Sequence, residues 1–90
     1  MDKQVHAYFS GRVQGVGFRF TVERIAMELG ISGWARNMPD GRVEVVGEAE
    51  EEALKEFIAR IQQYFWRYIR DTELEWLEPA GTFKDFRIKF

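Results

Sequence analysis

A glycine-rich loop followed directly by an arginine is the part of this sequence best suited to chemistry. Residues 11–19 read Gly-Arg-Val-Gln-Gly-Val-Gly-Phe-Arg and lie between a strand-like stretch and the start of a predicted helix. The first N–H groups of a helix lack partners within it, and the helix dipole makes that end positive. Glycines let successive N–H groups converge on an anion, and Arg19 would add a two-point grip on a phosphoryl group. The loop predicts an anion site; the alternative is a tight turn whose arginine faces water.

The loop differs from the common nucleotide-binding loops. A Walker loop continues as Gly-Lys-Ser/Thr, which is absent here, and residues 18–20 (Phe-Arg-Phe) replace the third glycine of a dinucleotide fingerprint. Arginine is also the only cation between residues 12 and 42, where there are five arginines and no lysine. A planar guanidinium suits two-point binding of carboxylate or phosphate better than an ammonium does.

Asn37, the only asparagine of the chain, is the second candidate for chemistry. Its amide is neutral at any useful pH, so it can orient a water molecule but cannot act as a base. An asparagine at the end of a strand also often caps the turn that follows. Considered from the residue alone, the capping role is favoured and catalysis is the alternative.

The other titratable groups are weaker candidates. His6 is the only histidine, and a catalytic triad would need a nucleophile and an acid beside it; Ser10, on the same strand face, is ~13 Å away. Glu50 to Glu52 suit the positive end of a helix, and Glu73 and Glu75 suit a solvent-facing strand edge. Neither set predicts paired-carboxylate hydrolysis.

The composition excludes several classes of protein. The 90 residues support one domain, 1–90, and the absence of cysteine beside a single histidine excludes disulfides, thiol nucleophiles and zinc sites. We therefore expect no metal and no cofactor. A net charge of −2 argues against general nucleic-acid binding. With no apolar signal region at the N-terminus and no uncharged run beyond eight residues, we expect a cytoplasmic protein without a membrane partner.

Apolar periodicity predicts the elements that would position the loop. Alternation indicates strands over residues 5–10, 31–37 and 42–48, near 72–76 and at 86–90. Helical spacing predicts two helices, of which the first ends at Gly30 and the second opens with three glutamates. Their apolar stripes are Val22, Ile25, Ala26 and Leu29, and Leu54, Phe57, Ile58 and Ile61. Two helices on one face of a mostly antiparallel sheet, in βαββαβ order, form a ferredoxin-like α+β sandwich.

Two segments in register strongly resemble the signature segments of acylphosphatases. They are residues 11–19 and residues 33–44 (Gly-Trp-Ala-Arg-Asn-Met-Pro-Asp-Gly-Arg-Val-Glu), and the resemblance extends to residues 83–90. It implies hydrolysis of the carboxyl–phosphate bond of acyl phosphates to carboxylate and inorganic phosphate, with no metal and no covalent intermediate. It also implies that Asn37 positions the attacking water. The phosphate-binding residues that it implies are Gln14, Gly15, Val16, Gly17, Phe18 and Arg19.

Residues 62–69 (Gln-Gln-Tyr-Phe-Trp-Arg-Tyr-Ile) depart from the family, which usually turns from helix to strand here with Gly-Pro. The helical stripe continues through Ile61, Phe65, Tyr68 and Ile69. Equally, Tyr68, Arg70, Thr72, Leu74 and Trp76 alternate as in a strand. The segment therefore either extends the second helix or begins the fourth strand. Its four aromatic residues predict either a satellite of the core or a contact surface. We expect a monomer, with a dimer or strand exchange through Tyr64–Ile69 as the alternative.

Two rival functions use the same fold. A non-catalytic anion-binding module would be favoured by substitutions at Arg19 or Asn37, and neither is substituted. A single-stranded RNA binder would stack bases on aromatic residues of its sheet, but the RNA-recognition pattern is absent. Val43 and Val45 are also found where aromatic residues of the third strand are expected. We therefore expect a small-molecule acyl phosphate as substrate and no nucleic acid.

Overall fold

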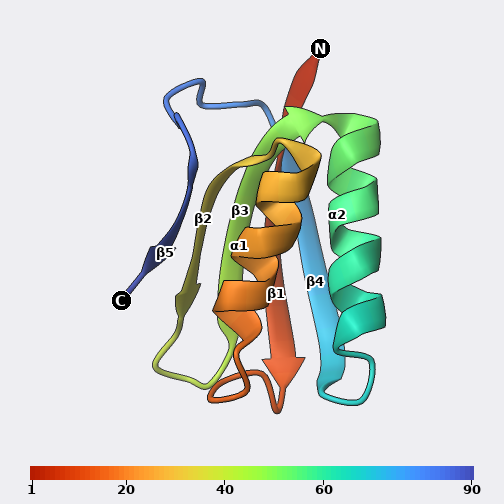
Figure 1. The fold of residues 1–90 in the computed structure, drawn as a ribbon, viewed down its shortest axis with the longest axis vertical. Helices are drawn as coiled ribbons and strands as arrows, with labels where there is room; N and C mark the ends of the chain where they lie inside the picture. The colour runs from red at the N-terminus through yellow and green to blue at the C-terminus, as the bar shows by residue number, and fades with distance from the viewer.

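The computed structural model describes residues 1–90, and its elements form two layers, a five-stranded sheet and two helices on one face of it (Figure 1). The strand order is β4-β1-β3-β2-β5, and every neighbouring pair is antiparallel except β2 and β5. This arrangement confirms the ferredoxin-like α+β sandwich. The elements are β1 (Asp2–Gly11), α1 (Phe18–Leu29), β2 (Ser32–Asn37), β3 (Val43–Glu50), α2 (Glu51–Tyr64), β4 (Ile69–Leu77) and β5 (Phe86–Lys89).

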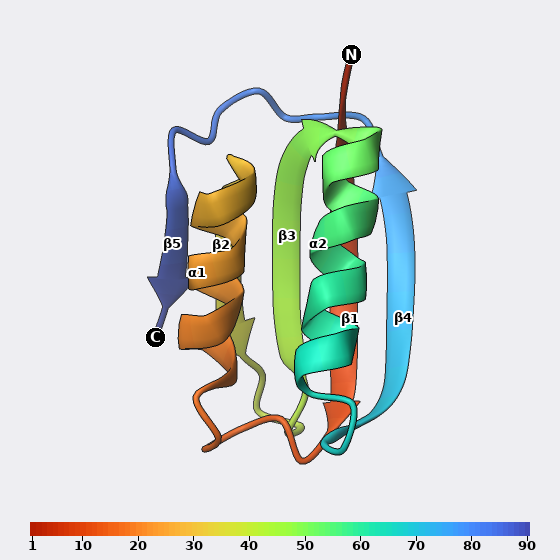
Figure 2. The ribbon, with the colours of Figure 1, turned by 45° about the vertical axis from the view of Figure 1, so that its right-hand side comes forward.

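The core lies between the sheet and the helices, which lie side by side across it (Figure 2). On β1 the predicted alternation is observed, because Val5, Ala7 and Phe9 are fully buried beneath the helices. Val43 and Val45 of β3 are fully buried on the same face. The expectation that these two valines occupy the positions of base-stacking aromatics is therefore wrong, since they point away from the open face of the sheet.

The ends of several elements differ from the predicted bounds. β1 begins at Asp2 rather than at residue 5 because β3 continues beside it, pairing Glu50 with Asp2. β5 ends at Lys89, one residue before the predicted end. The stop of α1 is confirmed: Gly30 is left-handed, with φ of 69°, and donates its N–H to the carbonyls of Ala26 and Met27.

Residues 62–69 are divided between two elements. The helix continues to Tyr64, four residues form a turn, and β4 begins at Ile69, so Tyr68 does not belong to the strand as one prediction held. Phe65 is buried, with its ring centroid 4.4 Å from that of Phe18 in α1. The rings of Tyr64 and Tyr68 lie edge-on to Phe65 at 4.8 and 6.2 Å. The segment thus contributes one side chain to the core and surrounds it with two half-covered rings.

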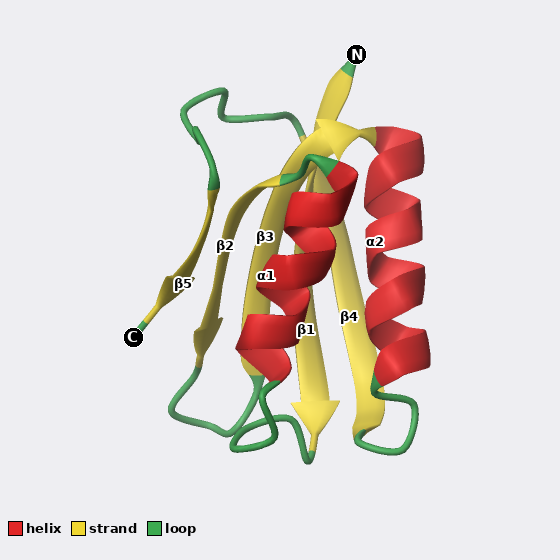
Figure 3. Cartoon of the chain, in the orientation of Figure 1, coloured by secondary structure: helices red, strands yellow, loops and turns green.

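The loops gather at the two ends of the sandwich (Figure 3). At one end, the connection from β4 to β5 is fixed by Glu48 of β3, whose side chain is 6% exposed. Its carboxylate accepts hydrogen bonds from the N–H groups of Ala80 at 2.5 Å and Gly81 at 3.2 Å, and from the side chain of Gln4 at 2.7 Å. Burial alone would raise the pKa of Glu48, but these donors lower it below its ordinary value. At the opposite end, the β1–α1 loop lies beside the β2–β3 turn.

A second buried carboxylate, Glu44, lies on the open face of the sheet and is 5% exposed. It accepts a hydrogen bond from Nε of Arg36 at 2.6 Å and lies 2.5 Å from Nε2 of His6. Burial alone would raise the pKa of Glu44, but the hydrogen bonds from Arg36 and His6 outweigh burial and lower it. His6 is therefore engaged with a carboxylate that is far along the chain, and not with a nucleophile.

Glu44 makes stability dependent on pH. Because its pKa is lower in the folded than in the unfolded chain, its charge stabilises the fold above the ordinary pKa of 4.5. This contribution is lost as the pH falls through the folded pKa. We expect the free energy of unfolding, measured by urea titration, to fall below about pH 5. This pH dependence should be weaker in Glu44→Gln. At neutral pH the same substitution should lower the free energy of unfolding by about 1–3 kcal/mol. Glu73→Gln, at an exposed site on β4, should keep the wild-type slope; equal slopes in all three proteins would contradict the assignment.

Candidate active site

A cavity of about 160 Å³ lies at the N-terminal end of α1, where the β1–α1 loop meets the end of β2. Its walls come from the loop, from the first turn of α1 and from the last residue of β2. The lining residues are Val13, Gly15, Gly17, Phe18, Arg19, Phe20 and Asn37. Five of the seven site residues expected from the sequence therefore surround one cavity; Gln14 and Val16 do not line it.

The first turn of α1 offers main-chain hydrogen-bond donors to this cavity. The first bond of the helix runs from the N–H of Thr21 to the carbonyl of Gly17 at 3.1 Å, so the N–H groups of residues 18–20 have no acceptor within the helix. No side chain caps this end, and no acidic residue lies in the first turn. In α2, by contrast, Glu51 and Glu52 occupy the first turn. An anion in the cavity would meet both the unpaired N–H groups and the positive end of the dipole.

The conformation of the loop depends on two glycines. Gly15 and Gly17 both have φ of 77°, in the left-handed region that other residues enter only at a cost of roughly 1–2 kcal/mol. A Cβ atom at either position would meet no heavy atom within 4 Å. The requirement for glycine is therefore conformational, and the space beside these two residues is open.

Alanine at Gly17 should weaken anion binding, and Gly30 supplies a matched control at the other end of the same helix. Both glycines are left-handed with open space at the Cβ position, so each substitution should lower the free energy of unfolding by about 1–2 kcal/mol. Gly17→Ala should also weaken binding of inorganic phosphate about tenfold or more, because displacing the loop removes one hydrogen bond to a charged group. Calorimetric titration should find the affinity of Gly30→Ala unchanged. Equal phosphate affinities in the two variants would count against a binding role for the loop.

Arg19 is the only charged side chain that lines the cavity. Its Nη1 donates a hydrogen bond to the carbonyl of Lys89 at 3.1 Å, and its guanidinium carbon lies 4.9 Å from the ring centroid of Phe90. It forms no ion pair with an acidic residue. Since a guanidinium has five N–H donors, most of them remain available to a ligand. The end of β5 thus orients Arg19 without neutralising it.

The side chain of Gln14 connects the two segments that carry the site. Its amide nitrogen donates to the carbonyl of Met38 at 2.8 Å and to that of Arg42 at 3.0 Å. These carbonyls belong to the β2–β3 turn, which follows Asn37 directly. Gln14 therefore fixes the loop relative to the turn, so only its main-chain N–H is left for a ligand. Val16, which is 36% exposed, lies at the outer surface of the loop.

Asn37 is half-buried at the end of β2, paired with Val43. The turn after it is closed by other groups: the N–H of Met38 donates to the carbonyl of Arg42 at 2.8 Å, and Asp40 accepts the N–H of Arg42 at 3.1 Å. The side chain of Asn37 makes no hydrogen bond, so the capping interpretation has no contact to support it. Its amide instead lines the same cavity as Arg19.

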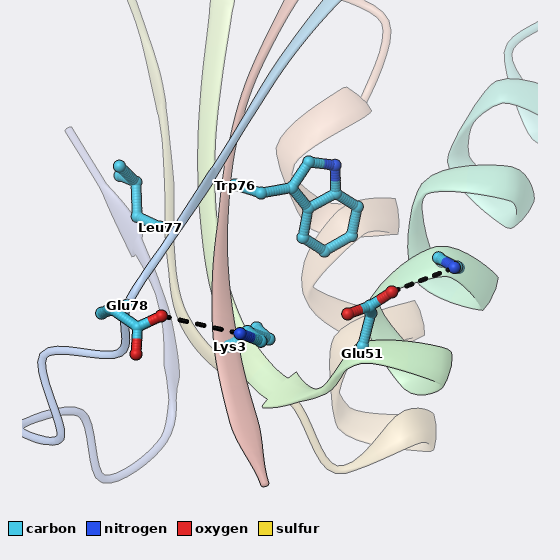
Figure 4. Close-up of a pocket in the computed structure, with 6 residues that line it drawn as sticks. Lys3, Glu51, Trp76, Leu77 and Glu78 are labelled. Carbon is cyan, nitrogen blue, oxygen red and sulfur yellow. Dashed lines mark ion pairs between the residues drawn. The ribbon is translucent and has the colours of Figure 1, made fainter.

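A larger hollow, of about 430 Å³, lies at the opposite end of the sandwich (Figure 4). Trp76 of β4 extends there toward the helical layer, with Leu77 nearby. The two cations that line the hollow are already paired: Lys3 lies 3.6 Å from Glu78, and Lys55 lies 3.0 Å from Glu51. The hollow therefore lacks the unpaired positive charge found at the smaller cavity.

The remaining carboxylates are dispersed. Glu73 and Glu75 are exposed on the edge strand β4, and no group of three or more histidines or carboxylates is placed to hold a metal ion. Neither helix has the length and apolar character needed to cross a membrane.

The fold and the cavity together define a ferredoxin-like α+β sandwich whose β1–α1 loop and uncapped first helix line a small cavity. The family model described as Acylphosphatase matches residues 5–88. An acylphosphatase of Caldanaerobacter subterraneus subsp. tengcongensis is 48% identical over 89 residues, covering 98% of this chain and 99% of the relative. One of Thermus thermophilus is 47% identical over 76 residues, covering 83% and 86%. The crystal structure of acylphosphatase from Bacillus subtilis superposes with a TM-score of 0.89 at 30% identity, covering 98% of this chain and 99% of that one. The chain belongs to the acylphosphatase family, which confirms the resemblance and the expected class of enzyme.

Proposed function

We propose that this chain hydrolyses acyl phosphates to a carboxylate and inorganic phosphate by direct attack of water, without a metal ion. The observation that carries the proposal is the cavity that brings the uncapped start of α1, Arg19 and Asn37 together. Membership of the acylphosphatase family supports the substrate class. The single domain over residues 1–90 contains every group that the reaction requires.

The phosphoryl group binds to main-chain N–H groups of the loop and of the first helical turn, residues 14–19, and to the guanidinium of Arg19. Phosphoryl transfer proceeds through a transition state with charge spread over three equatorial oxygens, so catalysis consists mainly of positioning and electrostatic stabilisation. N–H groups held by the helix and the two left-handed glycines are already aimed at that charge and need no reorganisation.

Asn37 orients the attacking water. The water oxygen forms a bond to phosphorus, and the bond from phosphorus to the acyl oxygen breaks, its electron pair leaving on the carboxylate. One water proton passes to a phosphoryl oxygen of the substrate and the other stays on the new hydroxyl, which gives carboxylate and dihydrogen phosphate. A carboxylate is a good leaving group without protonation, so the absence of a general acid from the cavity is consistent with this reaction.

No single residue can supply the whole acceleration. Removing one preorganised donor costs roughly 2.7–4 kcal/mol in acyl-transfer enzymes. Enzymes lower their barriers by at least about 8 kcal/mol. Arg19 must therefore act together with the loop N–H groups and Asn37.

Hydrolysis of a synthetic aryl acyl phosphate, followed by the loss of its ultraviolet absorbance in the presence of EDTA, tests the proposal. Rapid turnover unaffected by the chelator is expected. A folded protein that binds inorganic phosphate without turnover would instead identify a non-catalytic anion-binding module. Turnover that disappears on chelation and returns with a divalent cation would overturn the metal-independent mechanism.

The protein acts on its substrate as a cytoplasmic monomer, without a nucleic-acid or membrane partner. Asp71, Glu73 and Glu75 alternate along the edge strand β4, so two copies paired through this edge would bring acids together. Sedimentation velocity should give a single species near the chain mass of 10.7 kDa, and a concentration-dependent heavier species would contradict this.

A further inference from the structure

Phe20 is an exposed aromatic side chain in the wall of the phosphate-binding cavity. It lies in the first turn of α1 and is 59% exposed, although Phe18, two residues earlier, is 2% exposed in the core. An exposed ring does not contribute the free energy of folding that burial of its apolar surface would give. Packing of the fold therefore does not explain an aromatic residue at this position.

Most other exposed aromatic residues have a cation on the ring. Arginines lie over the rings of Tyr64, Trp66, Tyr68 and Phe90, at 4.9–5.9 Å from their centroids. Phe20 has neither a cation nor a second aromatic ring against it, so both faces of its ring are unoccupied by such partners. Trp76 is the other exposed aromatic residue of which this is true, and it lines the hollow at the far end of the sandwich.

The position of Phe20 brings its ring close to whatever is attached to a bound phosphoryl group. Its own N–H is one of the unpaired donors at the start of α1, while its side chain forms part of the cavity wall. A phosphate held by that turn therefore has the aromatic ring of the same turn beside it. The ring of Phe90, which is 97% exposed, lies over the guanidinium of Arg19.

The cavity contains no group that would pair with a charged acyl chain. Arg19 is its only charged lining residue, and the proposed function assigns that charge to the phosphate. A cationic acyl group would find no carboxylate there, and an anionic one no second cation. The apolar ring of Phe20 instead matches a neutral, apolar acyl group.

We infer that Phe20 is a specificity-determining residue that contacts the acyl group and makes the enzyme prefer acyl phosphates with aromatic or bulky apolar acyl groups. The inference rests on the proposed function, since it concerns the part of the substrate that is released as carboxylate. Selectivity for an added apolar group in such a site is expected to be about tenfold.

The test compares kcat/KM for benzoyl phosphate and acetyl phosphate, which carry the same reacting groups and differ in the aromatic ring. Phe20→Ala should lower kcat/KM for benzoyl phosphate about tenfold and change that for acetyl phosphate less than about threefold. Phe20→Tyr, which keeps the ring, should retain the wild-type ratio. Met27→Ala, at a 70% exposed apolar site two turns further along α1, should leave both values unchanged.

Inhibition by the products gives a second readout that does not depend on the chemical step. Benzoate should inhibit the wild type more strongly than acetate does, and Phe20→Ala should remove that difference. An equal loss for both substrates in Phe20→Ala would overturn the inference, because it would mean that Phe20 supports the phosphate site and not the acyl group. A wild type that turns over neither substrate would refute the proposed function instead, and the two failures are therefore distinguishable.

Discussion

Replacing Arg19 with glutamine is expected to lower kcat/KM for an acyl phosphate by about 10³- to 10⁵-fold, the range observed when an arginine that stabilises phosphoryl transfer is removed. Binding of inorganic phosphate should weaken in parallel. Arg19 is the only charged side chain lining the cavity, and glutamine offers neither its charge nor its planar fork. Steady-state kinetics together with calorimetric titration of phosphate measure the two effects separately.

Two further variants sharpen this prediction. Arg19→Lys keeps the charge but loses the two-point geometry. Its kcat/KM and its phosphate affinity should therefore lie between those of the wild type and those of Arg19→Gln. Arg24→Gln serves as the matched control, because Arg24 is on the same helix, outside the cavity, with its guanidinium over the ring of Tyr64. Its kinetics should remain near those of the wild type. Undiminished phosphate affinity in Arg19→Gln would refute the assigned role.

Asn37→Ala is expected to reduce kcat by about 10²- to 10³-fold, the usual cost of one preorganised polar group in the transition state. Its affinity for inorganic phosphate should change little, because the proposed role of the amide concerns the attacking water and not the bound anion. Stability should also be nearly unchanged, since the Asn37 side chain forms no hydrogen bond in the fold. Turnover, phosphate affinity and the free energy of unfolding are each measured on the same preparation.

The pattern of losses distinguishes the roles of Asn37. If phosphate affinity and kcat decline equally, the residue maintains the shape of the site and does not position water. If the protein is destabilised by several kcal/mol, the residue belongs to the turn. Only a selective loss of kcat agrees with the proposed mechanism.

Local signals made the fold predictable from the sequence. Alternation on β1, the stripes of α1 and α2, and Gly30 at the end of α1 each depend on near neighbours in the chain. Residues 62–69 satisfied two periodicities at once, and the boundary at Tyr64 follows from burial of Phe65 against α1, which is a tertiary contact. Local patterns alone could not decide that boundary.

For the candidate site, the sequence predicted the residues but not the contacts that hold them in place. Residue types and the two resembling segments indicated Arg19 and Asn37, and the cavity brings both together. The contacts that hold them could not be predicted: Gln14 reaches carbonyls 24 and 28 residues away, and Arg19 one 70 residues away. A carbonyl acceptor exists at every residue, so its identity gives no signal in a sequence. The contacts of the buried Glu44 carboxylate were missed for a related reason, because only the register of three strands places His6 and Arg36 beside it.

The bond from Arg19 to the carbonyl of Lys89 makes the site depend on the last strand of the chain. Because β5 is an edge strand, held on one side by β2 alone, its fraying removes a contact that orients Arg19. Binding linkage is reciprocal. If phosphate binds at Arg19 as proposed, it protects β5 from fraying to the same degree that docked β5 favours phosphate. Bound phosphate should therefore slow the opening of this end of the sheet, as measured by amide hydrogen exchange in β5.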